Sequence, residues 1–364
     1  MPEKTALFKE IVELEKKVEA TRLPPELKER CYGLVERLSR MIKYGEYSVA
    51  YERVAHYVDW VTALPWDKRS EDVLDLKIAK NILDDNHYGL EETKERILEY
   101  MAVLKLKKEK EGEKEGKKEI GEGGIMKFMR APMLLFVGLV GTGKTTIAYS
   151  IAEAMERKFA RIPFGGLGDP LDLRGQSRVR PDAEPGLIVK ALRRTGVKNP
   201  VILLDEIDRV TEQGRASIMG VLVELLDPEQ NMAFRDHFVD HSFDLSEVLF
   251  IATCNSTTTI SVAVMDRLEP IQMPSYTDEE KITIGKDYAL PRMMEEAGLD
   301  KDAIKIDVDV WPRIVRPLGY DAGVRTLQRT INGICRKVAK LIVQGKGKTF
   351  RITTENMKEF IPTW

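Results

Sequence analysis

A glycine-rich motif between two apolar stretches constrains this chain more than any other feature. Gly138 to Thr145 reads Gly-Leu-Val-Gly-Thr-Gly-Lys-Thr, the G-x-x-x-x-G-K-[ST] pattern of a phosphate-binding loop. The apolar run 133–137 before it suits a strand buried on both faces, and Ile147 and Ile151 after it follow helical spacing. This strand–loop–helix order is the setting in which the motif binds nucleotides, so the sequence predicts an α/β nucleotide-binding domain.

The residue types of the motif match the chemistry of binding phosphate. Glycines let backbone N–H groups close around phosphate oxygens, and the start of the following helix adds partial positive charge. Lys144 is predicted to reach the β- and γ-phosphates of ATP, and the Thr145 hydroxyl to bind Mg²⁺. The predicted cofactor-binding residues of the loop are Gly138, Gly141, Thr142, Gly143, Lys144, Thr145 and Thr146.

Polar side chains follow two further apolar runs. Asp205 and Glu206 come after the run 201–204, and Asn255 follows the run 248–252. A carboxylate at the end of a buried strand can hold Mg²⁺, and the next one can polarise the attacking water. The sequence therefore predicts Asp205 as a metal ligand and Glu206 as the residue that acts on the water. Asn255 is predicted to orient that water or to contact the γ-phosphate.

The order of patterns along the chain predicts three domains. Heptad-like apolar spacing in 1–64 indicates a helical stem, with an ordinary packing face or a coiled coil as alternatives. Alternating strands and helices in 65–275 indicate an α/β domain with a parallel sheet, interrupted by a charged, flexible insertion at 105–124. The helical patterns after Pro274 indicate a small helical lid domain at 276–364.

Composition narrows the setting of the protein. The 57 Lys and Arg residues against 59 Asp and Glu residues give a net charge of −2 among 364 residues, so no overall basic excess points to nucleic acid. Cys31, Cys254 and Cys335 are far apart and odd in number, which favours a reducing compartment over a disulfide framework. No run of about 18 apolar residues and no apolar leader is present, so we expect a cytoplasmic protein without a membrane segment.

Three further residues are candidates for the nucleotide site. Tyr88 lies in a segment that is predicted to wrap over the nucleotide base, with plain helix–turn packing as the alternative. Arg267 and Arg325 can each supply positive charge to the transition state of phosphate transfer, although a single arginine is more often a surface residue.

Taken together, these motifs resemble the AAA+ ATPase module of the Lon protease family. The resemblance covers about residues 50–362 and implies a ring, expected to be a hexamer, that hydrolyses ATP and unfolds protein substrates in protein quality control. It is carried by the stretches 57–60, 64–66, 87–91, 138–145, 204–208, 225–231, 250–255, 276–281 and 323–325.

The resemblance also implies roles for individual residues. Lys144 and Thr145 take the phosphate and Mg²⁺ roles, and Asp205 and Glu206 the metal and water roles. Asn255 corresponds to the first sensor of such ATPases. Arg267 resembles the arginine finger that reaches the nucleotide of a neighbouring subunit, and Arg325 the second sensor, carried by the lid.

The first pore loop departs from the family pattern. Arg180, in the stretch 174–186, stands where the family usually carries a tyrosine that grips the translocating chain. Together with Arg178, it suggests acidic substrate segments or a nucleic-acid strand as the bound partner. The alternative is a loop that only packs on its neighbour in the ring.

A second departure concerns peptide cleavage. The family's peptidase domain uses a Ser-Lys dyad, and no Pro-x-Asp-Gly-Pro-Ser-Ala-Gly stretch occurs in this sequence. We therefore expect no peptidase activity from this chain alone, whether the peptidase domain is separate or deleted. The predicted function is an ATP-hydrolysing motor that acts on protein. The alternatives are a motor that acts on nucleic acid and a non-catalytic ring partner of a full-length protease.

Overall fold

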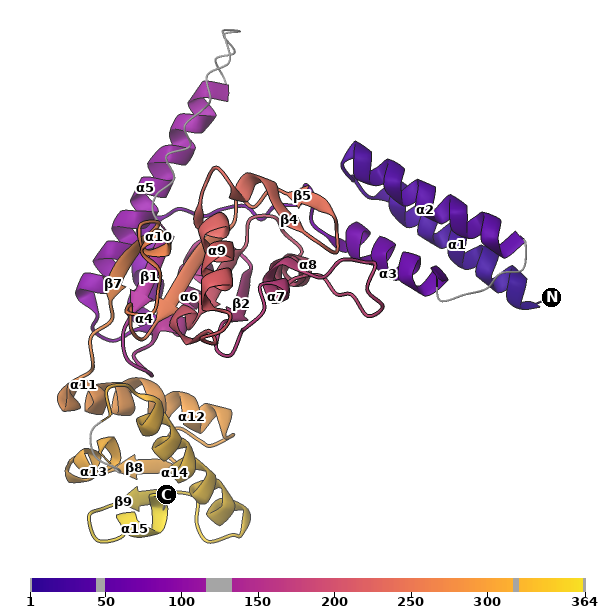
Figure 1. Cartoon of the computed structure of the whole chain (residues 1–364). Helices are drawn as coiled ribbons and strands as arrows, with labels where there is room; N and C mark the ends of the chain where they lie inside the picture. The colour runs from indigo at the N-terminus through magenta and orange to yellow at the C-terminus, as the bar shows by residue number, and fades with distance from the viewer. Residues whose placement is uncertain (1, 44–49, 116–132, 317–320, 363–364) are drawn as a thin grey trace.

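The computed structural model describes residues 2–43, 50–115, 133–316 and 321–362, and it places a helical stem, a central α/β layer and a lid in chain order (Figure 1). The stem helices pack their apolar stripes on one another, and the chain turns between the first two at residues 21–24. They are α1 (Pro2–Ala20), α2 (Pro25–Lys43) and α3 (Ala50–Ala63).

The centre of the molecule is a parallel sheet in the order β2-β3-β6-β1-β7. The three apolar runs predicted as strands form its three inner strands, which confirms the α/β prediction. The strands are β1 (Met133–Val137), β2 (Phe159–Pro163), β3 (Val201–Asp205), β6 (Leu249–Cys254) and β7 (Leu268–Gln272).

The two outer strands, β2 and β7, were not predicted, and their position explains why. An edge strand is half exposed, so its sequence alternates instead of forming a continuous apolar run. Arg161 in β2 and Glu269 in β7 interrupt the apolar pattern, and Pro270 in β7 is a residue that a sheet tolerates mainly at an edge.

Helices cover both faces of the sheet, because alternate residues of each inner strand point to opposite sides. In β1, Leu134 and Phe136 pack on the side of α4 (Leu76–Asn86), α5 (Glu91–Glu115) and α6 (Lys144–Ala154). Leu135 packs on the other side, which holds α8 (Leu187–Thr195) and α9 (Arg215–Leu226). The short helices of this domain are α7 (Leu171–Arg174) and α10 (Val262–Met265).

The sheet side that carries α8 and α9 also receives the stem. Tyr57 and Val58 of α3 belong to the same apolar cluster as Leu135. A hairpin of β4 (Phe234–Asp236) and β5 (His241–Phe243) lies against this junction, and the centre of the Trp66 ring lies 5.0 Å from that of the Phe243 ring.

The predicted charged insertion begins as helix. Residues 105–115 continue α5, whose end leaves the body of the α/β layer in Figure 1. The rest of the insertion, 116–124, lies outside the described residues. The predicted domain boundaries at 64/65 and 275/276 fall between elements, and they stay predictions.

The lid has its own core, around Trp311 and Ile331, and adds a two-stranded parallel sheet to its helices. Gly285, in the π-helical turn Ile284–Ala289, lets the Trp311 ring approach, since a Cβ there would lie 2.7 Å from it. The other elements are α11 (Asp278–Thr283), α12 (Leu290–Glu296), β8 (Ile304–Ile306), α13 (Trp311–Val315), α14 (Arg325–Val343), β9 (Phe350–Ile352) and α15 (Met357–Phe360).

The three cysteines are unpaired and buried, with one in each part of the chain. Burial raises the pKa of the Cys31 thiol in the stem to about 11, of Cys254 in the sheet to about 12 and of Cys335 in the lid to about 11. Among the described residues, no helix combines the length and apolar character needed to cross a bilayer.

Candidate nucleotide site

The phosphate-binding loop leaves β1 and enters α6 through backbone conformations that require glycine. Gly141 and Gly143 have φ values of 85° and 96°, in the left-handed region that side chains other than glycine rarely adopt. Gly138 is needed for a different reason, because a Cβ there would lie 2.6 Å from the Met273 carbonyl oxygen. The loop is therefore held tightly against the end of β7.

Two threonine hydroxyls fix the loop from within. Thr142 Oγ1 donates to the Leu139 carbonyl at 2.9 Å, and Thr146 Oγ1 donates to the Gly143 carbonyl at 2.8 Å. Thr145, the predicted Mg²⁺ ligand, is half-buried on the first turn of α6. The loop conformation thus depends on side-chain hydrogen bonds as well as on its glycines.

Lys144 folds back over the loop at the start of α6. Its Nζ donates to the Gly138 carbonyl at 2.5 Å, the Leu139 carbonyl at 2.9 Å and Asn255 Oδ1 at 3.0 Å. Burial lowers the pKa of the ammonium, while nearby carboxylates, Asp205 among them, oppose that shift. The negative charge of a bound phosphate group would offset the cost of burying the charged ammonium.

Asp205 ends β3 with both carboxylate oxygens engaged. Thr253 Oγ1, from the neighbouring strand β6, donates to Oδ1. Arg161 on β2 approaches Oδ2 with Nε at 2.7 Å and Nη2 at 2.6 Å. Sequence reasoning missed Arg161, because a single arginine on a short alternating strand carries no signal until the register of β2 and β3 is known.

Glu206 occupies a strained backbone position directly after β3. Its φ of 59° and ψ of 50° lie in the left-handed region, where glutamate is uncommon. Its N–H donates to Thr253 Oγ1 at 2.9 Å, and its Oε2 accepts from Arg209 Nη1 at 3.3 Å. The turn directs the carboxylate away from the sheet core, where it stays partly exposed.

Asn255 meets the loop from the end of β6. Its backbone N–H donates to Asp208 Oδ2 at 3.1 Å, which orients the amide toward Lys144. Within the described part of the chain, its Nδ2 and the Asp208 Oδ1 are buried without a hydrogen-bond partner. A buried amide donor left open beside the phosphate loop fits a phosphate oxygen or a water bound next to it.

The lid brings Arg325 to the same loop. The Val324 N–H donates to the Gly141 carbonyl at 3.0 Å, and Arg325 begins α14 immediately after it. The Arg325 Cγ would lie 3.4 Å from a Cβ placed on Gly141. The predicted residues Lys144, Asn255 and Arg325 therefore meet around one loop.

Tyr88 lies between the loop domain and the lid. His87 before it is buried, with Nε2 3.0 Å from Ser150 Oγ of α6, which ties this segment to the helix of the phosphate loop. The Tyr88 ring is 6.0 Å from the ring of Tyr288 in the lid. The contact with Tyr288 fits the alternative that Tyr88 has a packing role. Contact of Tyr88 with a nucleotide base stays a prediction.

Arg267 lies apart from the other candidates. Its backbone carbonyl accepts from Met133, at the opposite end of β1 from the phosphate loop and about 13 Å of strand away. Its guanidinium bonds to Asp227 Oδ2 at 2.8 Å and to the Ala263 carbonyl at 2.8 Å. The chain does not bring Arg267 to its own phosphate loop, and the role toward a neighbour stays a prediction.

The sheet order and the loop define the class of this protein as an ATPase domain of the AAA+ type. Residues 134–276 match the family model described as ATPase family associated with various cellular activities (AAA). Residues 295–350 match a second model, the Lon protease AAA+ ATPase lid domain. Each match falls on the part of the fold that the motifs predict.

Curated relatives give the particular family. The chain is 42% identical over 353 residues to Lon protease 2 of Thermus thermophilus, across 97% of this chain and 42% of the relative. It is 40% identical to Lon protease 1 of Bacillus subtilis, across 97% of this chain and 43% of the relative. The chain carries the AAA+ ATPase module of the Lon protease family and spans about two fifths of the length of these relatives.

Proposed function

We propose that this chain hydrolyses ATP with Mg²⁺ and uses the energy to unfold or remodel protein. The observation that carries the proposal is the convergence of Lys144, Asn255 and Arg325 on one loop, next to the Asp205–Glu206 pair. A module that only binds nucleotide has no need of a carboxylate held in a strained turn beside the loop.

The residues divide the work between binding and activation. Lys144 and the loop N–H groups would bind the phosphates, with Thr145 and Asp205 holding Mg²⁺, which neutralises charge on the phosphate oxygens. Asp205 would exchange its contact with Arg161 for the cation. Glu206 would accept a proton from the attacking water, and Asn255 would hold that water or the γ-phosphate in position.

We further propose a ring of identical subunits, expected to be a hexamer, with Arg267 completing the site of its neighbour. The position of Arg267 far from its own loop supports this arrangement. The nucleic-acid alternative loses support because Asp240, which lies 3.8 Å from Arg178, places a negative charge beside the basic pair. No described feature favours the non-catalytic alternative.

Steady-state ATPase measurements on the wild type and on Glu206→Gln test the proposal. The variant should keep its affinity for a fluorescent ATP analogue and lose about a hundredfold in turnover, because an amide cannot accept the water's proton. Glu295→Gln, which changes an exposed lid glutamate in the same way, is the matched control and should hydrolyse normally. If Glu206→Gln lowers turnover less than threefold, Glu206 does not act on the attacking water.

A further inference from the structure

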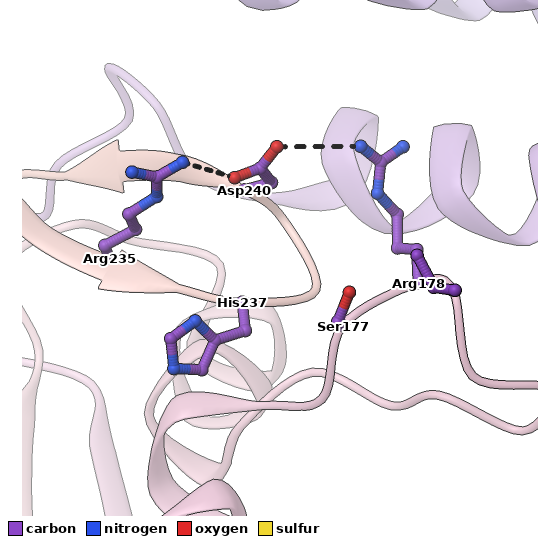
Figure 2. A pocket seen from close by; sticks show the side chains of 6 residues that line it. Ser177, Arg178, Arg235, His237 and Asp240 are labelled. Atoms are coloured by element: carbon purple, nitrogen blue, oxygen red, sulfur yellow. Dashed lines mark hydrogen bonds and ion pairs between the residues drawn. The ribbon is translucent and has the colours of Figure 1, made fainter.

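A cavity of about 480 Å³ lies away from the nucleotide site, between the loop 175–186 and the β4–β5 hairpin (Figure 2). We call it the arginine pocket. Its lining residues are Ser177, Arg178, Val179, Arg235, His237 and Asp240.

Positive charge exceeds negative charge at the arginine pocket. Asp240 receives three guanidinium groups, from Arg30 of the stem, Arg178 of the loop and Arg235 of the hairpin. The distances to its carboxylate oxygens are 3.2 Å, 3.8 Å and 2.5 Å, and Figure 2 shows the carboxylate between the two pocket arginines. One carboxylate balances one of the three charges, so the pocket has guanidinium donors left for a second anion.

Asp240 itself is held in place. Its φ of 52° is left-handed, a region that aspartate and asparagine adopt more readily than other residues with side chains. The hydrogen bond from Arg235 is the largest cause that lowers the pKa of Asp240, and it outweighs burial, which raises that pKa. The Asp240 side chain therefore stays ionised. The acid orients the arginines and at the same time competes for them.

The walls of the arginine pocket are tied together. Asp236 Oδ2 accepts from the Gly186 N–H at 2.8 Å, and the His237 N–H donates to the Arg174 carbonyl at 2.7 Å, which joins hairpin to loop. Tyr57 of the stem supports Arg178 from below and donates its hydroxyl to the Val239 carbonyl at 3.0 Å. A site fixed in this way loses little entropy when a ligand binds.

The rim adds an apolar contact. Val179 exposes 88% of its surface beside Arg178, an unusual position for a large apolar residue within a structured turn. A ligand that pairs a carboxylate with a neighbouring apolar group would satisfy both features, and polypeptides offer that combination.

We propose that the arginine pocket binds the side-chain carboxylate of an acidic residue in an extended polypeptide, with an adjoining apolar residue on Val179. This inference rests on the proposed function, in which the chain acts on a protein substrate. Arg235, whose side chain is 63% exposed, makes the first contact, and Ser177 offers a hydroxyl donor. Asp240 in the centre would repel a continuous phosphate backbone, so nucleic acid is the poorer fit.

Fluorescence anisotropy with labelled peptides tests the inference on the whole chain without nucleotide, so that the result does not depend on ATP hydrolysis. The acidic peptide carries Asp and Glu next to Leu, and its matched partner carries Asn and Gln instead. The acidic peptide should bind about tenfold more tightly, and the difference should shrink toward high salt. Equal affinity for the two peptides, or tighter binding of single-stranded DNA of the same length, would overturn the proposal.

Two variants act in opposite directions. Arg235→Gln should weaken binding of the acidic peptide about tenfold, and Arg292→Gln, an exposed arginine paired with Glu296 in the lid, is the control. Asp240→Asn keeps the left-handed turn, removes the competing charge and should tighten acidic-peptide binding severalfold. If Asp240→Asn weakens binding of the acidic peptide while circular dichroism shows an intact fold, the arginines of the pocket do not bind the carboxylate of the peptide. A chain that binds the acidic peptide but hydrolyses no ATP would refute the proposed function and leave this site standing.

Discussion

The candidate groups of the nucleotide site follow the ends of neighbouring parallel strands, whereas the arginine pocket joins segments that are distant in the chain. Asp205 is the last residue of β3 and Asn255 directly follows β6, so the sheet alone places them beside the loop. Arg30 and Asp240, by contrast, are 210 residues apart and meet only because the stem packs on the hairpin. The first site is set by local motifs on a sheet, and the second by docking between domains.

This difference predicts that changes at one site leave the other unaffected. The nucleotide site takes Arg325 from the lid and, in our proposal, Arg267 from a neighbour, while the arginine pocket is complete in one chain. Measuring ATP hydrolysis and acidic-peptide affinity on the same variants separates the two sites.

The largest effect is expected from Arg267→Ala. If Arg267 stabilises charge on a neighbour's nucleotide, its loss should reduce turnover by about 10³-fold or more while ATP still binds. Acidic-peptide affinity should not change, since Arg267 lies outside the arginine pocket. Mixing this variant with Lys144→Ala should restore part of the activity, because one chain supplies the arginine and the other the nucleotide. If Arg267→Ala alone hydrolyses ATP normally, the nucleotide site does not need Arg267 from a neighbouring subunit, and the two sites do not differ in this respect.

Acid should act on the nucleotide side through His87. Burial lowers its pKa from 6.5 to about 4, and the Lys94 charge adds to that shift. In the unfolded chain His87 binds a proton below pH 6.5, whereas in the folded chain it does so only below about pH 4. The free energy of unfolding therefore falls as the pH drops from about 6.5 to about 4.

Urea unfolding at pH 7.5 and at pH 4.5 measures this dependence. Between the two, the wild type should lose roughly 2–3 kcal/mol more unfolding free energy than His87→Gln, which has no proton to gain. Identical losses in the two proteins would exclude His87 as the acid-sensitive group.

A smaller effect is expected where the lid contacts the phosphate loop. A Cβ on Gly323 would lie 2.5 Å from the Gly141 carbonyl carbon, so Gly323→Ala must push the lid away from the loop. ATP affinity should fall about tenfold, in line with an overpacking cost of roughly 1–3 kcal/mol, and peptide affinity should stay unchanged. Gly220→Ala, in α9 with open space at its Cβ, is the matched control for calorimetric titration. Unchanged ATP affinity in Gly323→Ala would mean that the lid does not support the nucleotide.

The smallest effect should fall on the arginine pocket. Tyr57→Phe keeps the ring under Arg178 and removes the hydrogen bond to the Val239 carbonyl, at a cost of about 1 kcal/mol in unfolding free energy. Peptide affinity should drop slightly and ATP affinity not at all. A larger loss of ATP affinity than of peptide affinity would show that the stem supports the nucleotide site instead.

The contrast between the sites also explains what could be read from the sequence. Inner strands gave continuous apolar runs, and the polar residues after them predicted Asp205 and Asn255 at one edge of the sheet. The partners of those residues were not predictable in the same way. Arg161 reaches Asp205 from an edge strand without an apolar run, and Thr253 is hidden inside β6.

The sequence could predict only part of the arginine pocket. Arg178 was noticed as part of a basic pore loop, but its stacking on Tyr57 depends on how α3 docks. Arg30 lies on a stem helix and Arg235 on a hairpin strand, and neither position has a motif. Tertiary docking, unlike a buried strand or an amphipathic helix, leaves no periodic signal in a single sequence.

The placement of the three thiols has a consequence for following the chain in motion. Because Cys31, Cys254 and Cys335 are buried in the stem, the sheet and the lid, each reacts with a thiol-specific dye only after its own surroundings open. Variants that keep one cysteine at a time would turn labelling rates into separate opening rates for the three parts. ATP should slow labelling at Cys254 and Cys335 more than at Cys31, and an acidic peptide should slow it most at Cys31.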